Sequence, residues 1–184
     1  YGVSGPLIIS ASSQVGGITG STSDTCRIEN TVNRGNITAK GAANKIGGLI
    51  GFANGFTFVS DSHNYGNVLS SSTSATGYLG GLAGHGVKTS LLRSTNHGMI
   101  ECTNGQYVGG LAGRIEMSGT GNVGHVDSCF NYGSVKGGNK WIGGLFGYQS
   151  GDCEIRFSGN YGSVTGTGAK AVSDNTAGIV GTGQ

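Results

Sequence analysis

The strongest constraint on the fold of this chain is an internal repeat built around glycine. A template of apolar-Gly-Gly-(Leu or Ile)-x-Gly occurs five times, and a degenerate sixth copy spans 176–181. The first glycines of the template, replaced by alanine in the last copy, are Gly16, Gly47, Gly80, Gly109, Gly143 and Ala177. They are spaced by 31, 33, 29, 34 and 34 residues. A recurring period of this length is typical of repeat architectures, in which similar units bury their apolar faces against one another.

A second template, Asn-x-Gly-x-(Ile or Val), lies between the copies of the glycine template and keeps the same phase. Its asparagines are Asn33, Asn64, Asn96, Asn131 and Asn160. Because the two patterns recur together, we interpret residues 1–184 as a single repeat array. The chain begins at Tyr1 without a methionine, and we expect it to be a segment of a larger protein.

Glycine supplies 39 of the 184 residues, whereas charged residues make up 11% and proline occurs once. This balance excludes highly charged and proline-rich disorder, and the clustering of the glycines excludes collagen. The repeats are rich in Val, Ile, Thr and Ser and lack a helical period, which predicts short strands. Units of ~31 residues are too short for propeller blades, which need ~40 or more. We therefore predict an all-β fold, a parallel β-helix (β-solenoid) of about five to six coils of ~31 residues.

In a solenoid, equivalent residues of successive coils form columns along the axis. A β-branched column, four residues after the asparagines, is predicted to form one core wall: Ile37, Val68, Ile100, Val135 and Val164. A second core wall is predicted two residues after the first template glycine: Ile18, Leu49, Leu82, Leu111, Leu145 and Ile179. The column just before the glycines is also apolar and comprises Val15, Ile46, Leu79, Val108 and Ile142. Strict alternation places this last column on the opposite face, so either the Gly-Gly pair marks a bulge or both faces are covered.

The template asparagines are predicted to stack and to hydrogen-bond from coil to coil. Asparagine also tolerates the left-handed backbone of a tight turn, which is a further reason to expect it there. The glycine two residues after each asparagine indicates a turn or a close approach of backbones.

Several classes of function are excluded by charge and spacing. A formal net charge of +2 is too small to indicate nucleic-acid binding. The sequence contains no run of ~18 apolar residues, the length that a membrane-spanning helix needs. The acidic residues do not cluster when placed in register: Glu29 and Asp127 share a column but lie three coils apart. The four histidines lack metal-ligand spacing. We therefore predict no catalytic residues, no cofactor and no metal site, while a calcium-binding loop at Asp152 or Asp174 stays open.

The four cysteines are predicted to be buried thiols rather than disulfides. Cys26 and Cys153 stand at the same place in coils that are four apart, about 19 Å, whereas a disulfide needs Cα atoms within about 7 Å. Cys102 and Cys129 occupy different points of consecutive coils.

Two columns of outward-facing residues are the candidate binding surface. The first follows the template asparagines and contains Arg34, Tyr65, His97, Tyr132 and Tyr161. The second lies two residues before the first template glycine and contains Gln14, Lys45, Tyr78, Tyr107, Trp141 and Asn175. Exposed aromatic rings with polar tips suit protein partners or sugar rings. The alternative is that the rings only stack on each other and stabilise the sheets.

The templates resemble the GLUG motif, a short repeat named for its Gly-Leu-x-Gly core. The most specific stretch is Cys129-Phe-Asn-Tyr-Gly-Ser-Val135 followed by Trp141-Ile-Gly-Gly-Leu-Phe-Gly147. This motif is found in large secreted and cell-surface bacterial proteins, including immunoglobulin A-specific metallopeptidases and adhesin-like proteins. The resemblance implies an extracellular or cell-surface location and no catalytic residues in the repeat itself.

We therefore expect a non-catalytic extracellular module, a rigid stalk or adhesin-like segment that binds host protein or glycan. Two alternatives stay open. The first is a carbohydrate-active β-helix enzyme, and the second is a scaffold that positions a neighbouring protease domain.

Overall fold

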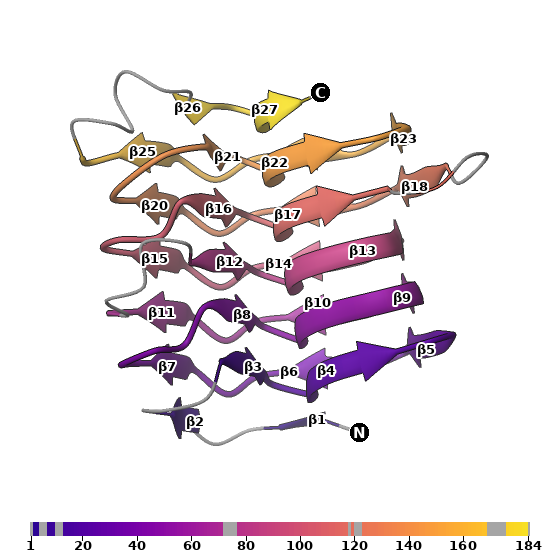
Figure 1. Cartoon of the computed structure of the whole chain (residues 1–184), viewed down its shortest axis with the longest axis horizontal. Coiled ribbons are helices and arrows are strands. Elements are labelled where there is room, and N and C mark those ends of the chain that lie inside the picture. The colour runs from indigo at the N-terminus through magenta and orange to yellow at the C-terminus, as the bar shows by residue number, and fades with distance from the viewer. Residues whose placement is uncertain are drawn as a thin grey trace.

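The computed structural model describes residues 2–3, 7–9, 13–71, 77–117, 119, 123–168 and 176–183. The chain is an all-β parallel solenoid of about five turns with ~31 residues per turn. Successive coils stack along one axis, and the two termini lie at opposite ends of the stack (Figure 1). Every strand pairing given for the described residues is parallel, as between β8 (Lys45–Gly47) and β12 (Tyr78–Gly80). The predicted fold class is confirmed.

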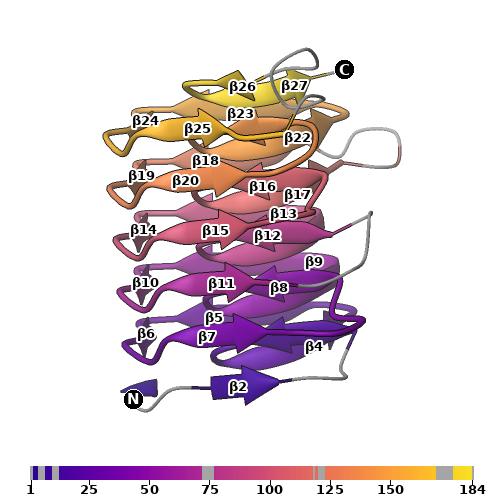
Figure 2. The same ribbon diagram turned by 90° about the vertical axis from the view of Figure 1, so that its left-hand side faces the viewer.

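The strands form four sheets, which run along the sides of the stack (Figure 2). The asparagine sheet contains β1 (Gly2–Val3), β6 (Val32–Asn33), β10 (His63–Asn64), β14 (Thr95–Asn96), β19 (Phe130–Asn131) and β24 (Gly159–Asn160). The valine sheet contains β2 (Leu7–Ile9), β7 (Ile37–Ala39), β11 (Val68–Ser70), β15 (Ile100–Cys102), β20 (Val135–Gly137) and β25 (Val164–Gly166).

The other two sheets meet at the Gly-Gly segments. The aromatic sheet contains β3 (Gln14–Gly16), β8, β12, β16 (Tyr107–Gly109), β21 (Ile142–Gly143) and β26 (Thr176–Ala177). The long-strand sheet contains β4 (Thr19–Ser23), β5 (Cys26–Glu29), β9 (Ile50–Ser60), β13 (Ala83–Leu92), β17 (Ala112–Glu116), β18 (Gly124–Asp127), β22 (Phe146–Ser150), β23 (Cys153–Arg156) and β27 (Val180–Gly183). Within the described residues, no helix is long and apolar enough to cross a lipid bilayer.

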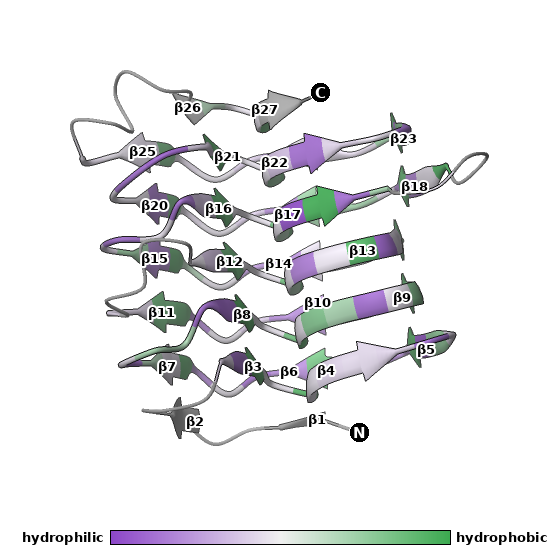
Figure 3. Ribbon diagram, viewed as in Figure 1, coloured by the Kyte–Doolittle hydropathy of each residue, from purple (hydrophilic) through white to green (hydrophobic). Residues whose placement is uncertain are grey.

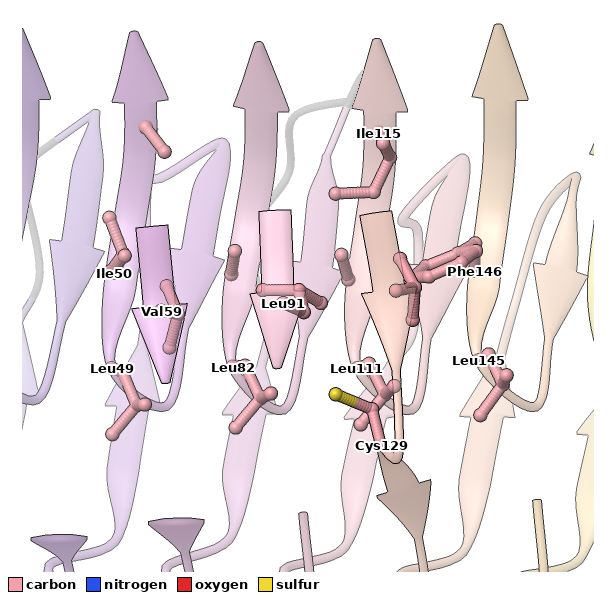
Figure 4. Close-up of a cluster of buried hydrophobic side chains, with 14 of the residues drawn as sticks. Leu49, Ile50, Val59, Leu82, Leu91, Leu111, Ile115, Cys129, Leu145 and Phe146 are labelled. Atoms are coloured by element: carbon pink, nitrogen blue, oxygen red, sulfur yellow. The ribbon is translucent and has the colours of Figure 1, made fainter. Parts of the chain in front are cut away.

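The predicted columns are confirmed by the strand register. Val68 pairs with Ile37 on one side and Ile100 on the other. In the leucine column, the backbone N–H of Leu49 donates to Leu82 O at 3.0 Å, and that of Leu82 donates to Leu111 O at 2.8 Å. Figure 4 shows Leu49, Leu82, Leu111 and Leu145 in one row across successive coils. Only the end positions Ile18 and Ile179 are exposed, 36% and 42%, because they stand in the outermost coils.

The interior holds two apolar clusters. One contains the leucine column and the inward residues of the long strands, and the other contains the valine sheet together with the column before the glycines. Along β9, β13 and β17, hydrophobic and hydrophilic residues follow one another (Figure 3). Ile46 and Leu49 are both fully buried, although strict alternation predicted opposite faces. The reason is that the chain turns a corner between them, so the inside of one sheet leads to the inside of the next.

The asparagine ladder lies inside the solenoid. Each Nδ2 donates to Oδ1 of the next asparagine, at 2.7 Å from Asn33 to Asn64 and at 2.8 Å from Asn64 to Asn96. The same bond joins Asn96 to Asn131 at 2.8 Å and Asn131 to Asn160 at 2.7 Å. Each Nδ2 also donates to the carbonyl of the glycine two residues on, as from Asn96 to Gly98 at 2.8 Å. The predicted coil-to-coil hydrogen bonding is confirmed.

The expectation of a left-handed turn at the asparagines is wrong. A positive φ recurs instead three residues before each asparagine, at Asn30, Asp61, Arg93, Ser128 and Phe157. The asparagines themselves lie in short strands, where the ladder uses their side chains. The following glycines are required by close approach, because a Cβ on Gly98 would lie 1.9 Å from Gly66 O. Of the two roles predicted for these glycines, the structure therefore selects the close approach.

The glycine template is required at the corner for two different steric reasons. A Cβ on Gly80, the first glycine, would lie 2.1 Å from Ala83 O, where the chain bends. A Cβ on Gly81, the second, would lie 2.2 Å from Cγ of Asn96 in the same coil. The same clash recurs between each second glycine and its asparagine. This contact explains why the two sequence templates keep one phase.

The cysteine prediction is confirmed in part. All four cysteines are free, and Cys102 and Cys129 are buried, but Cys26 and Cys153 are only half-buried. Burial raises the pKa of Cys129 to about 12 and that of Cys153 to about 11, so both thiols are protonated at neutral pH. Cys129 belongs to an inward column of small polar residues two positions before the asparagines: Thr31, Ser62, Ser94, Cys129 and Ser158.

Candidate functional site

The first predicted column forms an exposed stack on the asparagine sheet. Ring centroids are 4.5 Å apart between Tyr65 and His97, 4.8 Å between His97 and Tyr132, and 5.3 Å between Tyr132 and Tyr161. The Arg34 guanidinium lies 4.9 Å from the centroid of Tyr65 and covers that end of the stack. We call these five residues the tyrosine column.

The stacking decides what the tyrosine column can offer to a ligand. The planes of neighbouring rings differ by only 7° to 16°, so each inner ring has both faces covered by its neighbours. Ring edges and hydroxyl groups are what remain accessible, except at Tyr161, which is 71% exposed. Burial lowers the pKa of His97, and His97 Nε2 lies 3.0 Å from the Thr95 hydroxyl. The column therefore suits partners that form hydrogen bonds more than sugar rings that need an open aromatic face.

The second predicted column is also stacked, but it is half-buried. Tyr78 and Tyr107 have centroids 4.7 Å apart, and Tyr107 and Trp141 are likewise 4.7 Å apart. Burial raises the pKa of Tyr107. Lys45 precedes the rings in the column, and its ammonium lies 4.7 Å from the centroid of Phe52. Asn175 and the possible calcium ligand Asp174 lie outside the described residues.

A second wall, which the sequence templates did not predict, packs against this column. It consists of the outward residues at the third position of the long strands: Phe52, His85, Arg114 and Tyr148. The rings of Tyr78 and His85 stack with centroids 4.9 Å apart, and Tyr107 meets Tyr148 edge-on at 5.6 Å. Side chains on two outer faces can touch in this way only if the corner between the sheets is concave. We call the groove between these two walls the aromatic trough.

A simple signal could have revealed the second wall. Each of its members directly follows the third glycine of a template, as His85 follows Gly84 and Arg114 follows Gly113. The glycine itself lies at the concave corner, where a Cβ on Gly84 would be 2.4 Å from Ile46 N. Extending the template by one residue would have displayed a second aromatic and basic column.

The centre of the trough is a buried histidine among charges. His85 is 8% exposed and lies between the rings of Phe52 and Tyr78. Its Nε2 is 3.5 Å from Glu116 Oε2, and the same oxygen forms an ion pair with Arg114 Nη2 at 2.8 Å. Burial first, and then the nearby Arg114 and Lys45, lower the pKa of His85 to about 3. The imidazole is therefore neutral at physiological pH.

The acidic residues are in the predicted register. Glu29 and Asp127 share one column, with Ser60 and Leu92 between them. Asp61 is held in a bidentate pair by Arg93, with both contacts at 2.7 Å, which lowers the pKa of Asp61. Within the described ranges, no group of three or more His, Cys, Asp or Glu residues is placed to hold a metal ion.

A hollow of about 390 Å³, which the sequence templates did not predict, lies at the far end of the long strands. It is lined by Phe56, Phe58, Lys88, Ser90, Met117, Val123, His125 and Glu154. Two of its polar groups already face each other, since His125 Nδ1 is 3.4 Å from Glu154 Oε2. Lys88 lies 5.0 Å from the centroid of Phe56, so this ring is partly covered by a cation of the chain itself.

Fold and surface together define a β-solenoid repeat module that carries aromatic columns on its outer walls. Over 98 residues the chain is 34% identical to halomucin of Haloquadratum walsbyi. The match covers 51% of this chain and 1% of halomucin, so the chain corresponds to a small fraction of that relative. No family model matches the chain, and no solved structure matches it. The resemblance to GLUG repeats therefore depends on the two templates alone and stays a prediction.

Proposed function

We propose that the chain is a non-catalytic extracellular module, a rigid stalk or adhesin-like segment that binds a host protein or glycan. The observation that carries this proposal is the pair of aromatic columns, stacked on consecutive coils over the outer walls of the solenoid. Rings that are already ordered lose little conformational freedom when a partner binds. The partial similarity to halomucin supports a location outside the cell.

Rigidity is the second element of the proposal. The asparagine ladder ties five consecutive coils together through buried hydrogen bonds, and the leucine column does the same through packing. A rod held by such continuous contacts keeps a surface at a fixed distance and orientation. This property suits a stalk that presents a binding surface, and it equally suits a scaffold beside another domain.

Binding by the purified chain tests the proposal. We expect the chain to bind members of a panel of glycans and host surface proteins, and we expect Trp141→Ala combined with Tyr107→Ala to abolish that binding if the trough is the surface used. The double substitution Tyr65→Ala and Tyr132→Ala is the matched comparison, since it removes two stacked rings from the tyrosine column on the asparagine sheet and leaves the trough intact. A chain that binds nothing would favour the scaffold role, and cleavage of a polysaccharide would favour an enzyme.

A further inference from the structure

Among the residues that the structure describes, the aromatic trough carries a net charge of +2. Its cations are Lys45, Arg114 and Lys140, and its carboxylate is Glu116. The complete sequence contains 11 Lys and Arg residues and 9 Asp and Glu residues. Lys170 and Asp174 lie outside the described residues, and the other seven cations outside the trough are matched by seven acids. Among the described residues, the excess of positive charge is therefore gathered in one groove rather than spread over the surface.

Each cation of the trough is positioned by aromatic rings. The Arg114 guanidinium lies 5.1 Å from the centroid of Tyr148 and 5.9 Å from that of Tyr107. The Lys140 ammonium lies 5.2 Å from the centroid of Trp141. Within the part of the chain that the structure describes, Lys45 forms no ion pair, whereas Arg114 shares Glu116 with His85. Lys45 and Arg114 are two coils apart, about 10 Å along the axis, so the charges form a line.

We propose that the aromatic trough binds an acidic polysaccharide, whose carboxylate or sulfate groups pair with Lys45, Arg114 and Lys140. This inference rests on the proposed function as a binding module and names its ligand class. The hydroxyl groups of the sugar units face the edges of Tyr78, Tyr107 and Tyr148. The polymer lies along the solenoid axis, because the line of cations runs that way.

Two other anionic polymers fit the trough less well. A single-stranded nucleic acid binds such surfaces by stacking its bases on open aromatic faces, but the faces of Tyr78 and Tyr107 are covered by neighbouring rings. An extended acidic peptide gains its main-chain hydrogen bonds from a free sheet edge. The trough runs across the strands, and the backbone groups there already pair from coil to coil. A hydroxyl-rich polymer needs neither an open ring face nor a sheet edge.

Trp141 is the only tryptophan of the chain, so its fluorescence reports directly on the trough. The full chain would be titrated with polygalacturonate and with dextran sulfate, using dextran and poly-glutamate of similar length as comparisons. We expect both acidic polysaccharides, or the one with the preferred acid group, to change the Trp141 emission. Affinity should fall as the salt concentration rises from about 50 to about 300 mM, because the contacts include exposed charges.

Variants locate the site. Arg114→Gln and Lys45→Gln should each weaken binding about tenfold, as expected for the loss of a charge-assisted hydrogen bond. Arg114→Lys keeps the charge and should retain most of the affinity, which separates a charge effect from a disturbed fold. Lys136→Gln is the matched control, because it removes a cation paired with Glu101 on the valine sheet, away from the trough.

Three results would overturn the inference. They are equal binding of dextran, binding of poly-glutamate as tight as that of the polysaccharides, and equal losses in Lys136→Gln and Arg114→Gln. Failure of the inference is distinguishable from failure of the proposed function. If the chain still binds a protein or a neutral glycan in the broader panel, the binding module stands and only its ligand class is wrong.

Discussion

Replacing Asn96 by alanine tests the ladder on which the solenoid depends. Asn96 is fully buried, accepts from Asn64 Nδ2 at 2.8 Å, and donates to Gly98 O and Asn131 Oδ1, both at 2.8 Å. The substitution removes the partner of three groups: a buried N–H on Asn64, a buried oxygen on Asn131 and the carbonyl of the buried Gly98. Each orphaned group costs about 2 kcal/mol, so we expect the free energy of unfolding to fall by about 6 kcal/mol.

The position in the ladder provides the comparison. Asn160 is the last asparagine of the ladder and is only half-buried, so Asn160→Ala orphans one N–H of Asn131 and should cost about 2 kcal/mol. Asn96→Asp keeps the size of the side chain but cannot donate, and it should be at least as harmful as the alanine. This variant separates lost hydrogen bonds from lost volume.

Urea unfolding measures both effects. Trp141 emission and far-UV circular dichroism should give coincident transitions, since a repeat protein that unfolds in segments would not yield a single free energy. The reasoning is refuted if Asn96→Ala costs less than about 1 kcal/mol, or if Asn160→Ala costs as much as Asn96→Ala.

Three further outcomes follow from individual contacts. Phe157 is 80% exposed and has a φ of 46°, a left-handed conformation that asparagine adopts more readily than phenylalanine. Phe157→Asn should therefore raise the free energy of unfolding by about 1 kcal/mol, which a higher midpoint of thermal unfolding would show. The pKa of His85 is about 3 in the folded chain, below its unfolded value, so the unfolded state takes up a proton first as the pH falls below 6.5. Stability should therefore decline by up to about 1.4 kcal/mol per pH unit between pH 6.5 and 3, and His85→Phe should flatten this part of a pH series of urea midpoints. The Cys129 thiol donates to Asp127 O at 3.3 Å, as the Ser94 hydroxyl donates to Leu92 O at 2.8 Å. Cys129→Ser should therefore leave the urea midpoint nearly unchanged. A fall in the free energy of unfolding of more than about 2 kcal/mol would show that Cys129 and Ser94 do not play equivalent roles in their column.

Columns could be predicted from the sequence because a parallel solenoid places equivalent residues above one another. Spacing along the chain then becomes neighbourhood in space, and the register of Ile37, Val68 and Ile100 follows from two short templates. The same logic placed Tyr65, His97 and Tyr132 on the outer wall, where they stack. The same spacing also predicted that Glu29 and Asp127 share one column but lie three coils apart, as the strand register shows.

The angle between neighbouring sheets was decided only by the tertiary structure. Alternation along a strand indicates inside and outside within one sheet, but it does not encode the corner at which Ile46 and Leu49 both turn inward. That corner depends on the closure of the whole coil and on the steric room that glycine leaves there, since a Cβ on Gly84 would reach the backbone of the facing strand. The concave trough is a consequence of the corner. For this reason the sequence determined the two aromatic columns, whereas the packing of His85 and Arg114 against one of them emerged only once the sheets were folded together.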